Sequence, residues 1–469
     1  MAKDLRVKIL EHCQVSPPPD SVNPQTSLIP LTFFDVPWLF FPPTQPLFFY
    51  PYPYSTSHFL SATLPTLKQS LSLTLQHFFP FAGHLVLDSK SNRPKIVYNK
   101  KHSFVSLTFA ESNADFHYIS GDRPRDVEQF HPLVPSLERS LQSSDDENKG
   151  LPLLAVKVTV FPNSGLCIGL AYHHVAADGR TFDNFIKTWA SFHKDSSFLI
   201  TAMPSYDRTL VIDKHGLEAI FLKEWRKKKS AEHEMVIVTK SKAEFSNKVR
   251  ATFVMGLTEM EKIKRWIVTE CKKKNLREPV HLSPYVVTCA FVWGCLMKAA
   301  CNEGVADKYP NDYPSYLGFN AGGLNRFDCR VPSTYFGNCV GFGRCEATRG
   351  DLMGENGIIL AAKAIGDTVK KLDKALLGEA ERWISDWEVF YRSEPHMMVV
   401  GSPKVHLYET DFGWGRPNKI EEISIDQCGA ISLTESRCER GGIEVGLALP
   451  KPQMDTFTSL FDQGLKAKM

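Results

Sequence analysis

The sequence predicts a mixed α/β protein built in two halves. Its 469 residues are many for one domain, and strand and helix patterns alternate on both sides of a stretch that has no sustained periodicity. A hydrophobic content of 43% and a charged content of 23% are typical of a folded globular protein. We expect an N-terminal lobe over residues 1–198, an inter-lobe linker over 199–249 and a C-terminal lobe over 250–469.

The N-terminal half opens with an alternating pattern over residues 7–13, which predicts a strand. An aromatic, proline-broken segment over 29–39 reads as a loop. Leucines at helical spacing then predict a helix over 59–79, with Pro65 in or near its first turns. Short strands are expected at 96–98 and 104–109.

A hairpin followed by a helix occupies the centre of the chain. Residues 154–161 alternate as a strand, 162–165 form a turn, and 166–172 are a more apolar second strand. Phe182, Phe185, Ile186 and Trp189 follow at i, i+3, i+4 and i+7, which predicts one apolar helix face. His174 therefore comes where a buried strand ends.

The C-terminal half resumes the alternation after the linker. Strands are expected at 251–255, 316–320, 423–426, 430–434 and 443–449, and helices at 259–271, 284–300, 359–376 and 454–465.

Charge and cysteine usage exclude several classes of protein. A net charge of +3 is too small to indicate nucleic-acid binding, and the basic runs 226–229 and 272–274 read as solvated faces. The 11 cysteines are scattered without a C-x-x-C pair, which predicts reduced thiols and no metal site. No apolar run reaches the ~18–20 residues of a membrane helix, and no signal peptide precedes the first strand. We expect a cytoplasmic monomer without nucleic-acid or membrane partners.

His174 and Asp178 form an H-x-x-x-D pair followed by Gly179. An imidazole near neutrality can act as general base toward a hydroxyl. Asp178 could orient that imidazole, as in a triad, or anchor the turn, and the spacing alone leaves both open. His173 faces the other side of a continuing strand, so one histidine points into a given cavity.

No nucleophile motif accompanies this pair. The chain has no G-x-S-x-G, H-E-x-x-H, G-x-x-x-x-G-K-[ST] or G-x-G-x-x-G after a strand. Their absence argues against a serine hydrolase, a zinc protease, a P-loop enzyme and a Rossmann dehydrogenase. It favours direct transfer with one base.

Two further stretches combine glycine with aromatic residues, Y-F-G-N-C at 335–339 and D-F-G-W-G-R-P at 411–417. Each alone reads as a tight turn with close backbone approach. Together with H-x-x-x-D-G, at this order and spacing, they resemble the motifs of the plant BAHD acyltransferases over essentially the whole chain. The segments 31–38, 70–75, 81–83 and 401–404 also look like that family, and 32–38 with Y-F-G-N-C looks like its anthocyanin and flavonoid glycoside branch.

The resemblance implies a two-lobed chloramphenicol-acetyltransferase-like α/β fold with a channel between the lobes. Acyl-CoA would be a co-substrate, with no bound cofactor. His174 would deprotonate a sugar hydroxyl, whose oxygen attacks the thioester carbonyl. The indole N–H of Trp414 is the candidate oxyanion donor, and Asp178 becomes a structural anchor of the motif.

The resemblance also assigns the other site residues. Contacts to CoA or the acyl group would come from Ser283, Ser402, Pro403, Asp411, Gly413 and Arg180. Trp38 and Phe34 would line the acceptor channel, and a structural role falls to Gly179, Arg326, Tyr335, Gly337 and Asn338. Arg326 stands for the family's D-x-R arginine, which usually pairs with the motif aspartate. A direct count back from Tyr335 reaches 322–324 instead, so this assignment presumes a two-residue deletion.

The acyl donor is the open choice. A malonyl donor needs a cation, for which Arg180 is placed, whereas a hydroxycinnamoyl donor needs an aromatic slot, for which Trp38 and Phe34 are available. We favour transfer of a coumaroyl, caffeoyl or feruloyl group to a sugar hydroxyl of an anthocyanin or flavonoid glucoside. The alternatives are malonyl transfer to flavonoid or phenolic glucosides and, in another class, a non-catalytic relative that binds CoA esters. The intact His174 and D-F-G-W-G speak against the last.

Overall fold

The computed structural model of the protein describes residues 7–22, 28–87, 93–137, 150–230, 247–301, 310–327, 331–392 and 396–467. In these ranges the strands form one six-stranded, one seven-stranded and one four-stranded sheet. The mixed α/β class predicted from the sequence is therefore confirmed.

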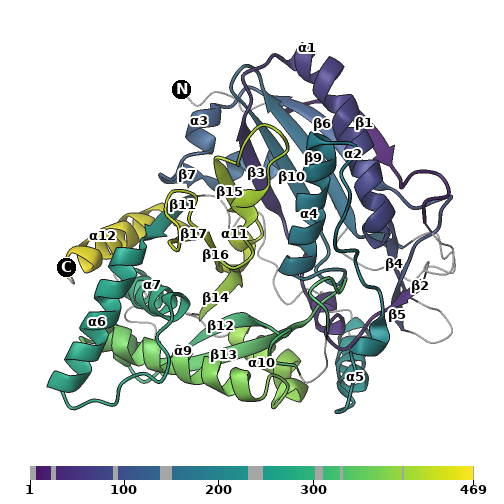
Figure 1. Ribbon diagram of the computed structural model, residues 1–469. Coiled ribbons are helices and arrows are strands. Elements are labelled where there is room, and N and C mark those ends of the chain that lie inside the picture. Colours follow the sequence, from purple (N-terminus) through teal and green to yellow (C-terminus); the bar gives the residue numbers. More distant parts are fainter. Residues whose placement is uncertain are drawn as a thin grey trace.

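The six-stranded sheet contains the central hairpin. Its strands are, in spatial order, β1 (Val7–Val15), β6 (Val105–Ser112), β9 (Leu154–Phe161), β10 (Gly165–Tyr172), β3 (Pro46–Pro51) and β15 (Lys419–Glu422). Strands β9 and β10 pair antiparallel, as predicted, and β10 is buried along its whole length. Helices α2 (Leu64–His77) and α4 (Gly179–Lys194) lie side by side over this sheet (Figure 1).

The amphipathic pattern after the hairpin forms α4 as predicted. Phe182, Phe185, Ile186 and Trp189 are all buried. Because β10 has paired neighbours on both sides and a helix follows directly, the segment between them is held at both ends.

The seven-stranded sheet belongs mainly to the C-terminal half. Its strands are β13 (Val340–Thr348), β12 (Pro314–Gly322), β14 (His396–Gly401), β16 (Ile431–Glu435), β17 (Ile443–Pro450), β11 (Lys248–Met255) and β7 (Arg125–Asp126). Four long helices pack together beside it (Figure 1): α6 (Leu257–Lys273), α7 (Pro284–Cys301), α9 (Gly357–Lys374) and α12 (Lys451–Ala467).

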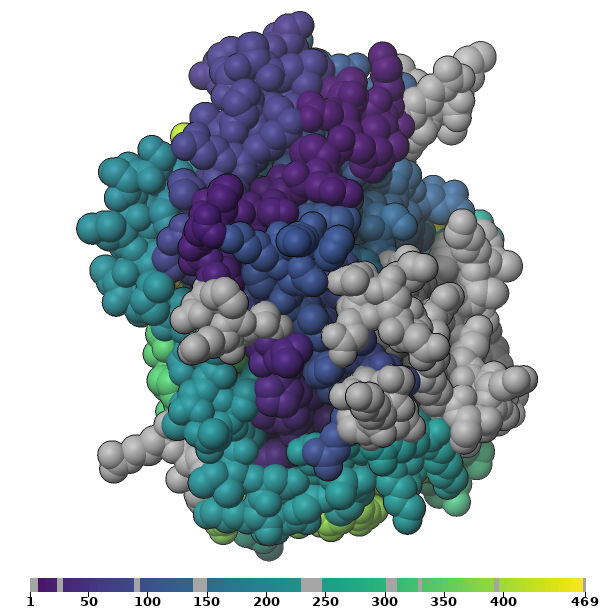
Figure 2. Space-filling view, turned by 90° about the vertical axis from the view of Figure 1, so that its right-hand side faces the viewer, coloured from purple at the N-terminus to yellow at the C-terminus, as the bar shows by residue number. Residues whose placement is uncertain are grey.

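The remaining elements are short or peripheral. The small sheet consists of β2 (Leu28–Pro30), β5 (Pro94–Val97), β4 (His84–Leu87) and β8 (Leu151–Pro152). The other helices are α1 (Thr56–His58), α3 (Phe116–Ile119), α5 (Leu217–Ser230), α8 (Arg349–Met353), α10 (Trp383–Arg392) and α11 (Ile425–Cys428). Helix α5 contacts the 3₁₀ turn η2 (Val36–Phe40), and purple N-terminal and teal mid-chain segments adjoin on one face in Figure 2.

The two large sheets exchange edge strands. β15, from the C-terminal half, pairs with β3, and β7, from the N-terminal half, pairs with β11. Each half of the chain therefore completes the other half's sheet, which couples the two lobes through backbone hydrogen bonds.

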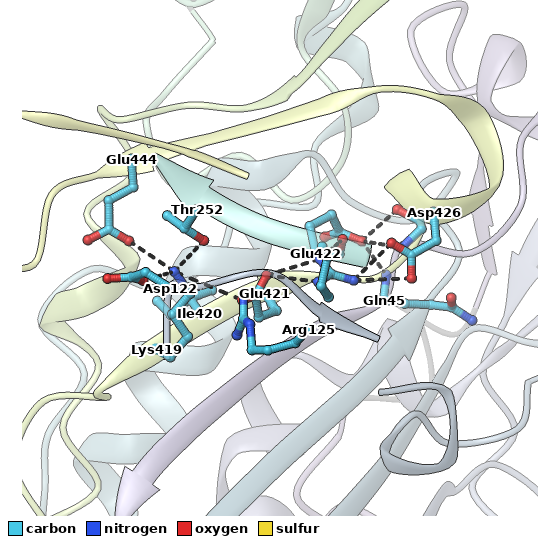
Figure 3. Close-up of polar contacts among 12 residues, drawn as sticks. Gln45, Asp122, Arg125, Thr252, Lys419, Ile420, Glu421, Glu422, Asp426 and Glu444 are labelled. Atoms are coloured by element: carbon cyan, nitrogen blue, oxygen red, sulfur yellow. Dashed lines mark hydrogen bonds and ion pairs between the residues drawn. The ribbon is translucent and has the colours of Figure 1, made fainter. Parts of the chain in front are cut away.

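A buried ion network lies where these exchanged strands meet (Figure 3). The Glu421 carboxylate on β15 accepts from Arg125 on β7 at 2.8 Å and pairs with Arg250 on β11 at 3.0 Å. Arg250 also contacts Asp426 at 3.0 Å, and Lys419 contacts Asp122 at 2.8 Å. Burial raises the pKa of Glu421, but Arg125, Arg250 and Lys419 outweigh it and hold the pKa at about 2. The carboxylate is therefore ionised at neutral pH and fully paired.

The sequence analysis placed one strand wrongly, at 423–426. The strand is β15, and residues 423–428 turn into α11. Apolar alternation indicated the wrong residues because the strand is rich in charge, and its buried Lys419 and Glu421 have partners that lie far away in the sequence. Strands β13 and β14 and helix α10 were not predicted.

The predicted linker over 199–249 contains helix α5, and its residues 231–246 lie outside the described ranges. The lobe boundaries themselves stay a prediction. In the part of the chain that the structure describes, no helix has the length and apolar character needed to cross a bilayer.

Candidate active site

His174 lies in the turn between β10 and α4. Strand β10 ends at Tyr172, and backbone hydrogen bonds to the carbonyls of His173 and His174, of 3.0 and 3.2 Å, close the turn. Asp178 then caps α4, since its Oδ1 accepts from the Thr181 N–H at 2.9 Å. His173 is buried, whereas His174 keeps partial exposure. The two histidines thus have different surroundings, and His174 is the more exposed of the two.

The imidazole of His174 is held by stacking. Trp38, on η2, lies over it with ring centroids 3.6 Å apart and planes inclined by 21°. Nδ1 is buried and has no hydrogen-bond partner within the described ranges. Burial lowers the pKa of His174 to about 4, although the charges of Asp178 and Asp35 act in the opposite direction. The ring is therefore neutral at physiological pH and able to accept a proton.

Asp178 ties the turn to the Y-F-G-N-C segment. Besides capping α4, its Oδ2 accepts from the backbone N–H of Cys339 at 3.2 Å and lies 3.4 Å from Arg180 Nη2. Because His174 Nδ1 has no partner, Asp178 does not orient the imidazole as a triad carboxylate would. Of the two roles that the spacing left open, the geometry agrees with the anchor.

Arg326 does not contact Asp178, contrary to the prediction. The chain turns directly after β12, and Arg326 donates to Asp373 on α9 at 2.8 Å and to the carbonyl of Gly322 at 2.9 Å. The presumed two-residue deletion therefore identified the wrong arginine. The cation beside Asp178 is Arg180, whose Nη1 also donates to the carbonyl of Ser333.

A buried carboxylate that the sequence analysis did not single out, Asp35, joins the N-terminal loop to Asn338. Asp35 Oδ1 accepts from the backbone N–H of Asn338 at 3.0 Å and from its side-chain Nδ2 at 2.9 Å. The same Nδ2 donates to the carbonyl of His174 at 2.9 Å. Asp35 Oδ2 accepts from Thr32, and Arg208 Nη1 lies 3.7 Å from it.

This network reaches the turn that carries His174 by two routes, one through Trp38 and one through Asn338. Asp35 immediately precedes η2, which carries Trp38, and through Asn338 it reaches the backbone of His174. The neighbouring Gly337 has a φ of +137°, and a Cβ there would lie 2.2 Å from Arg208 Nη1, so only glycine fits. Arg208 also donates to the Tyr335 hydroxyl at 2.6 Å. Tyr335, Gly337 and Asn338 thus lie in the contacts around the His174 turn, and the structural role that the resemblance implied for them stays a prediction.

The D-F-G-W-G loop lies at the other end of α4. Asp411 accepts from the N–H groups of Gly413 and Gly415 at 2.8 and 2.9 Å and pairs with Lys194, the last residue of α4. Gly413 has a φ of +96°, as a tight loop requires. The structure therefore does not bring Asp411 and Gly413 together with His174, which precedes α4.

Trp414 is too far from His174 to be the oxyanion donor, so this prediction is wrong. Its indole packs on Tyr50 of β3 and on Tyr52, which follows that strand, with ring centroids 5.6 and 5.9 Å away. Tyr50 pairs with Leu166, six residues before Tyr172, which corresponds to about 20 Å along the strand. Glycine-aromatic patterning alone could not distinguish a loop beside His174 from a loop that packs at the other end of α4.

The residues expected to hold CoA lie near a group of cations. Ser283 precedes α7, and the turn from Ser402 through Pro403 is tied to α4 because Lys187 donates to the carbonyl of Val405 at 3.1 Å. The cations, which the sequence analysis did not assign to this site, are Arg326, Lys370 and Lys404. Arg326 and Lys370 both pair with Asp373, at 2.8 and 3.4 Å. Burial first, and then the three positive charges against the opposing charge of Asp373, lower the pKa of His281, two residues before Ser283.

Two hollows flank the segment 335–341. The wider one, of about 330 Å³, is lined by the polar face of α4, including Arg180, and by Tyr335 and Phe336. The narrower one is an aromatic crevice whose packing leaves no space for a water molecule, and it is lined by Phe34, Pro37, Trp38, Asn320, Val340, Gly341, Phe342, Trp383 and Trp387. Trp38 separates this aromatic crevice from the His174 imidazole. In the described ranges no cluster of three or more His, Cys, Asp or Glu side chains could bind a metal ion.

Within the described ranges, His174 has no triad carboxylate on its Nδ1, an arrangement that suits direct group transfer by one base better than hydrolysis through a covalent intermediate. The family model described as the Transferase family matches residues 7–463. The chain therefore belongs to this family, that of the BAHD acyltransferases, and it is an acyltransferase.

Curated relatives match nearly the whole chain. It is 36% identical to malonyl-coenzyme A:anthocyanin 3-O-glucoside-6''-O-malonyltransferase of Dahlia pinnata, over 98% of this chain and 97% of the relative. It is 37% identical, with the same coverage, to coumaroyl-CoA:anthocyanidin 3-O-glucoside-6''-O-coumaroyltransferase 1 of Arabidopsis thaliana.

Among solved structures, vinorine synthase superposes with a TM-score of 0.68 over 97% of this chain and 98% of its own, at 18% identity. TRI101 of F. sporotrichioides superposes with a TM-score of 0.64 over 91% and 96%, at 17% identity. The predicted two-lobed, chloramphenicol-acetyltransferase-like fold is thereby confirmed.

Proposed function

We propose that this protein transfers a hydroxycinnamoyl group from its CoA thioester to a sugar hydroxyl of an anthocyanin or flavonoid glucoside. The observation that carries the proposal is the neutral His174 imidazole beneath Trp38, next to an aromatic crevice. The relatives supply the substrate classes, and they include both coumaroyl and malonyl transfer to anthocyanin glucosides.

The reaction needs one base. With Nδ1 buried, Nε2 of His174 is the nitrogen left to take the proton of the sugar hydroxyl. The hydroxyl oxygen then forms a bond to the thioester carbonyl carbon, and the C–S bond breaks as the tetrahedral intermediate collapses. The imidazolium returns its proton to the leaving thiolate, so the base is regenerated without a covalent enzyme intermediate.

The cations around His281 support CoA as the co-substrate. Arg326, Lys370 and Lys404 provide positive charge for phosphates beside Ser283 and the Ser402–Pro403 turn. Lys370 and Arg326 share one carboxylate, Asp373, so the group keeps an excess of positive charge. No bound cofactor takes part in this scheme, and we propose that the enzyme acts as a cytoplasmic monomer.

Trp38, which stacks on His174, and its aromatic neighbours Phe41 and Trp387 favour a hydroxycinnamoyl over a malonyl donor. Flat aromatic rings stack on indole and phenyl groups, whereas a malonyl carboxylate needs a free cation. Arg180, the cation predicted for that role, already contacts Asp178 and Ser333.

The test is acyl transfer from coumaroyl-, caffeoyl-, feruloyl-, malonyl- and acetyl-CoA to a panel of flavonoid and phenolic glucosides, read by mass spectrometry. We expect hydroxycinnamoyl products from the wild type and a loss of about 10²–10⁴-fold in turnover in His174→Ala. Unchanged turnover in the variant would contradict the base assignment. A wild type that binds CoA esters without transferring them would favour the non-catalytic alternative.

A further inference from the structure

A short segment of the predicted linker, residues 205–210, lies against the Y-F-G-N-C motif. The backbone N–H of Ser205 donates to the Thr334 carbonyl at 2.9 Å, and the Ser205 carbonyl accepts from the Phe336 N–H at 2.8 Å. These two bonds enclose Tyr335, with which Ser205 forms a parallel bridge. The segment is therefore fixed on the motif by its backbone.

Arg208, on this segment, has a side chain that is only 9% exposed. Its Nη1 donates to the Tyr335 hydroxyl at 2.6 Å and to the Phe336 carbonyl at 2.9 Å. The guanidinium lies over the Tyr335 ring, 5.2 Å from its centroid, and Nη1 is 3.7 Å from Asp35 Oδ2. Nε and Nη2 are buried and have no hydrogen-bond partner in the described part of the chain.

This arrangement differs from that of an arginine paired for stability. Arg250 uses all three of its nitrogens, on the carboxylates of Glu421 and Asp426 and on the Glu422 carbonyl. Arg208 makes its hydrogen bonds through Nη1, although a buried polar group without a partner costs about 1–3 kcal/mol. A buried cation that is kept at such a cost indicates that its charge is needed where it lies.

The charge of Arg208 reaches the base through Asp35. Burial lowers the pKa of His174, whereas the carboxylates of Asp178 and Asp35 raise it. Among the described residues, the cation that pairs with Asp178 is Arg180, at 3.4 Å, and the cation that pairs with Asp35 is Arg208. Removal of either cation therefore leaves more negative charge near the imidazole.

We propose that Arg208 is a positioning residue for acyl transfer, which holds Asp35 and the Y-F-G-N-C motif in place and balances the charge of Asp35 near His174. The inference rests on the proposed function, because it takes His174 as the base. It assigns a role in the reaction to a part of the chain that no motif marks.

The first test is Arg208→Met, which removes the charge and keeps an unbranched side chain. Without this cation the Asp35 carboxylate stabilises the imidazolium more strongly, so the acid inflection of kcat/KM should move to higher pH by about 0.5–1 unit. We expect kcat to fall by about 10–100-fold, because the base is displaced, while KM for the acyl-CoA stays within about two-fold of the wild-type value. An inflection at the wild-type pH would overturn the proposal.

Arg208→Lys separates the charge from the shape of the side chain. The ammonium keeps the positive charge but not the planar fork that lies over Tyr335. The acid inflection should therefore return to the wild-type pH, with only part of kcat restored. An inflection as high as that of Arg208→Met would contradict charge balance.

The double variant Arg208→Met/Asp35→Asn tests whether the charge acts through Asp35. Because the amide has no charge to balance, Arg208→Met should no longer raise the inflection when Asp35→Asn is present. A rise of the same size in both backgrounds would show that Arg208 does not act through Asp35.

Arg344→Met is the matched control. Arg344 is a partly buried arginine that also lies over a tyrosine, 5.1 Å from the Tyr316 ring centroid, and it is 3.4 Å from the Asp386 carboxylate. Its pH profile should match that of the wild type, and equal effects of Arg344→Met and Arg208→Met would count against the proposal. Thermal unfolding identifies a variant that fails to fold. Arg208→Gln, which is neutral but can still donate, then replaces Arg208→Met.

Histidine titration in NMR spectra of isotope-labelled protein follows the imidazole without turnover. The His174 signal is assigned by its loss in His174→Ala, and its midpoint should move to higher pH in Arg208→Met. Such a shift, together with unchanged turnover in His174→Ala, would contradict the proposed function and support the link between Arg208 and His174. Loss of turnover in His174→Ala, with neither a shift nor a fall in kcat in Arg208→Met, would do the reverse.

Discussion

The buried carboxylates of Glu421 and Asp35 are both nearly inaccessible, yet their surroundings differ. Glu421 lies between Arg125, Arg250 and Lys419, and each of its oxygens has a charged partner (Figure 3). Asp35 is bound mainly by neutral N–H and O–H groups, and the cation that pairs with it, Arg208, is 3.7 Å away.

The difference extends to the neighbouring polar atoms. Near Asp35, His174 Nδ1 and Asn338 Oδ1 are buried without a partner among the described residues, whereas near Glu421 the one such atom on Arg437, Nη1, belongs to a guanidinium that also pairs with Asp122 and Glu444. Paired charges hold two lobes together, whereas polar atoms left unpaired are what a substrate can use. Burial of a charge alone therefore did not mark the functional site in this protein.

The substitution Glu421→Gln is expected to have the largest effect, a loss of folding stability. Removing the shared anion leaves two buried arginines without their common partner, which should destabilise the fold by about 3–5 kcal/mol. Chemical denaturation measures the loss of free energy. At temperatures where the variant is folded, kcat should stay within a few-fold of the wild-type value. A loss of kcat in a variant of unchanged stability would contradict the distinction between the Glu421 and Asp35 networks.

Asp35→Asn should lower kcat, in contrast to Glu421→Gln, which is expected to lower stability. The amide cannot provide the charge-assisted bonds that fix Asn338, so the His174 backbone loses its support. A displacement of the base by about 1 Å costs on the order of 10²-fold. Steady-state kinetics should show this fall in kcat with an unchanged KM for the acyl-CoA.

The control for Asp35→Asn is Glu444→Gln, which alters another buried carboxylate, one that accepts from the Tyr408 hydroxyl at 2.8 Å. Equal kcat in the two variants would show that Asp35 has no special link to the base.

A smaller effect is expected from Arg180→Ala. Arg180 contacts Asp178 at 3.4 Å and the Ser333 carbonyl from a partly exposed position, so its loss should lower kcat/KM by less than about tenfold. The decrease should be equal for coumaroyl- and malonyl-CoA. A selective loss of malonyl transfer would instead restore Arg180 as the cation for the donor carboxylate.

The smallest change is expected in kcat/KM when the pH is varied. An imidazole with a pKa of about 4 stays neutral, so kcat/KM should remain level from about pH 8 to pH 5 and fall only below that. In the unfolded chain the same group titrates at 6.5, so the unfolded state binds more protons between these values, and folding stability decreases as the pH falls through this window. A pH–rate profile with an inflection near 6.5 would show that Trp38 does not shield the ring.

Local patterns predicted much of the fold. The hairpin of β9 and β10, the amphipathic face of α4 and the strand end before His174 follow from periodicity and turn residues within about thirty positions. The strand at 419–422 was missed because its buried residues are charged, and periodicity cannot recognise a buried lysine whose partner is nearly 300 positions away.

The sequence by itself determined the family motifs, the turn that carries His174 and the absence of a nucleophile motif. Tertiary structure decided which groups meet there: Asp35 with Asn338, 303 positions apart, and Trp38 on His174. It also placed Arg326 on Asp373 and Trp414 on Tyr50 and His193, at the far end of α4 from His174. Spacing encodes what a segment of chain does locally, but the desolvation and pairing that give side chains their chemistry arise only when distant segments pack together.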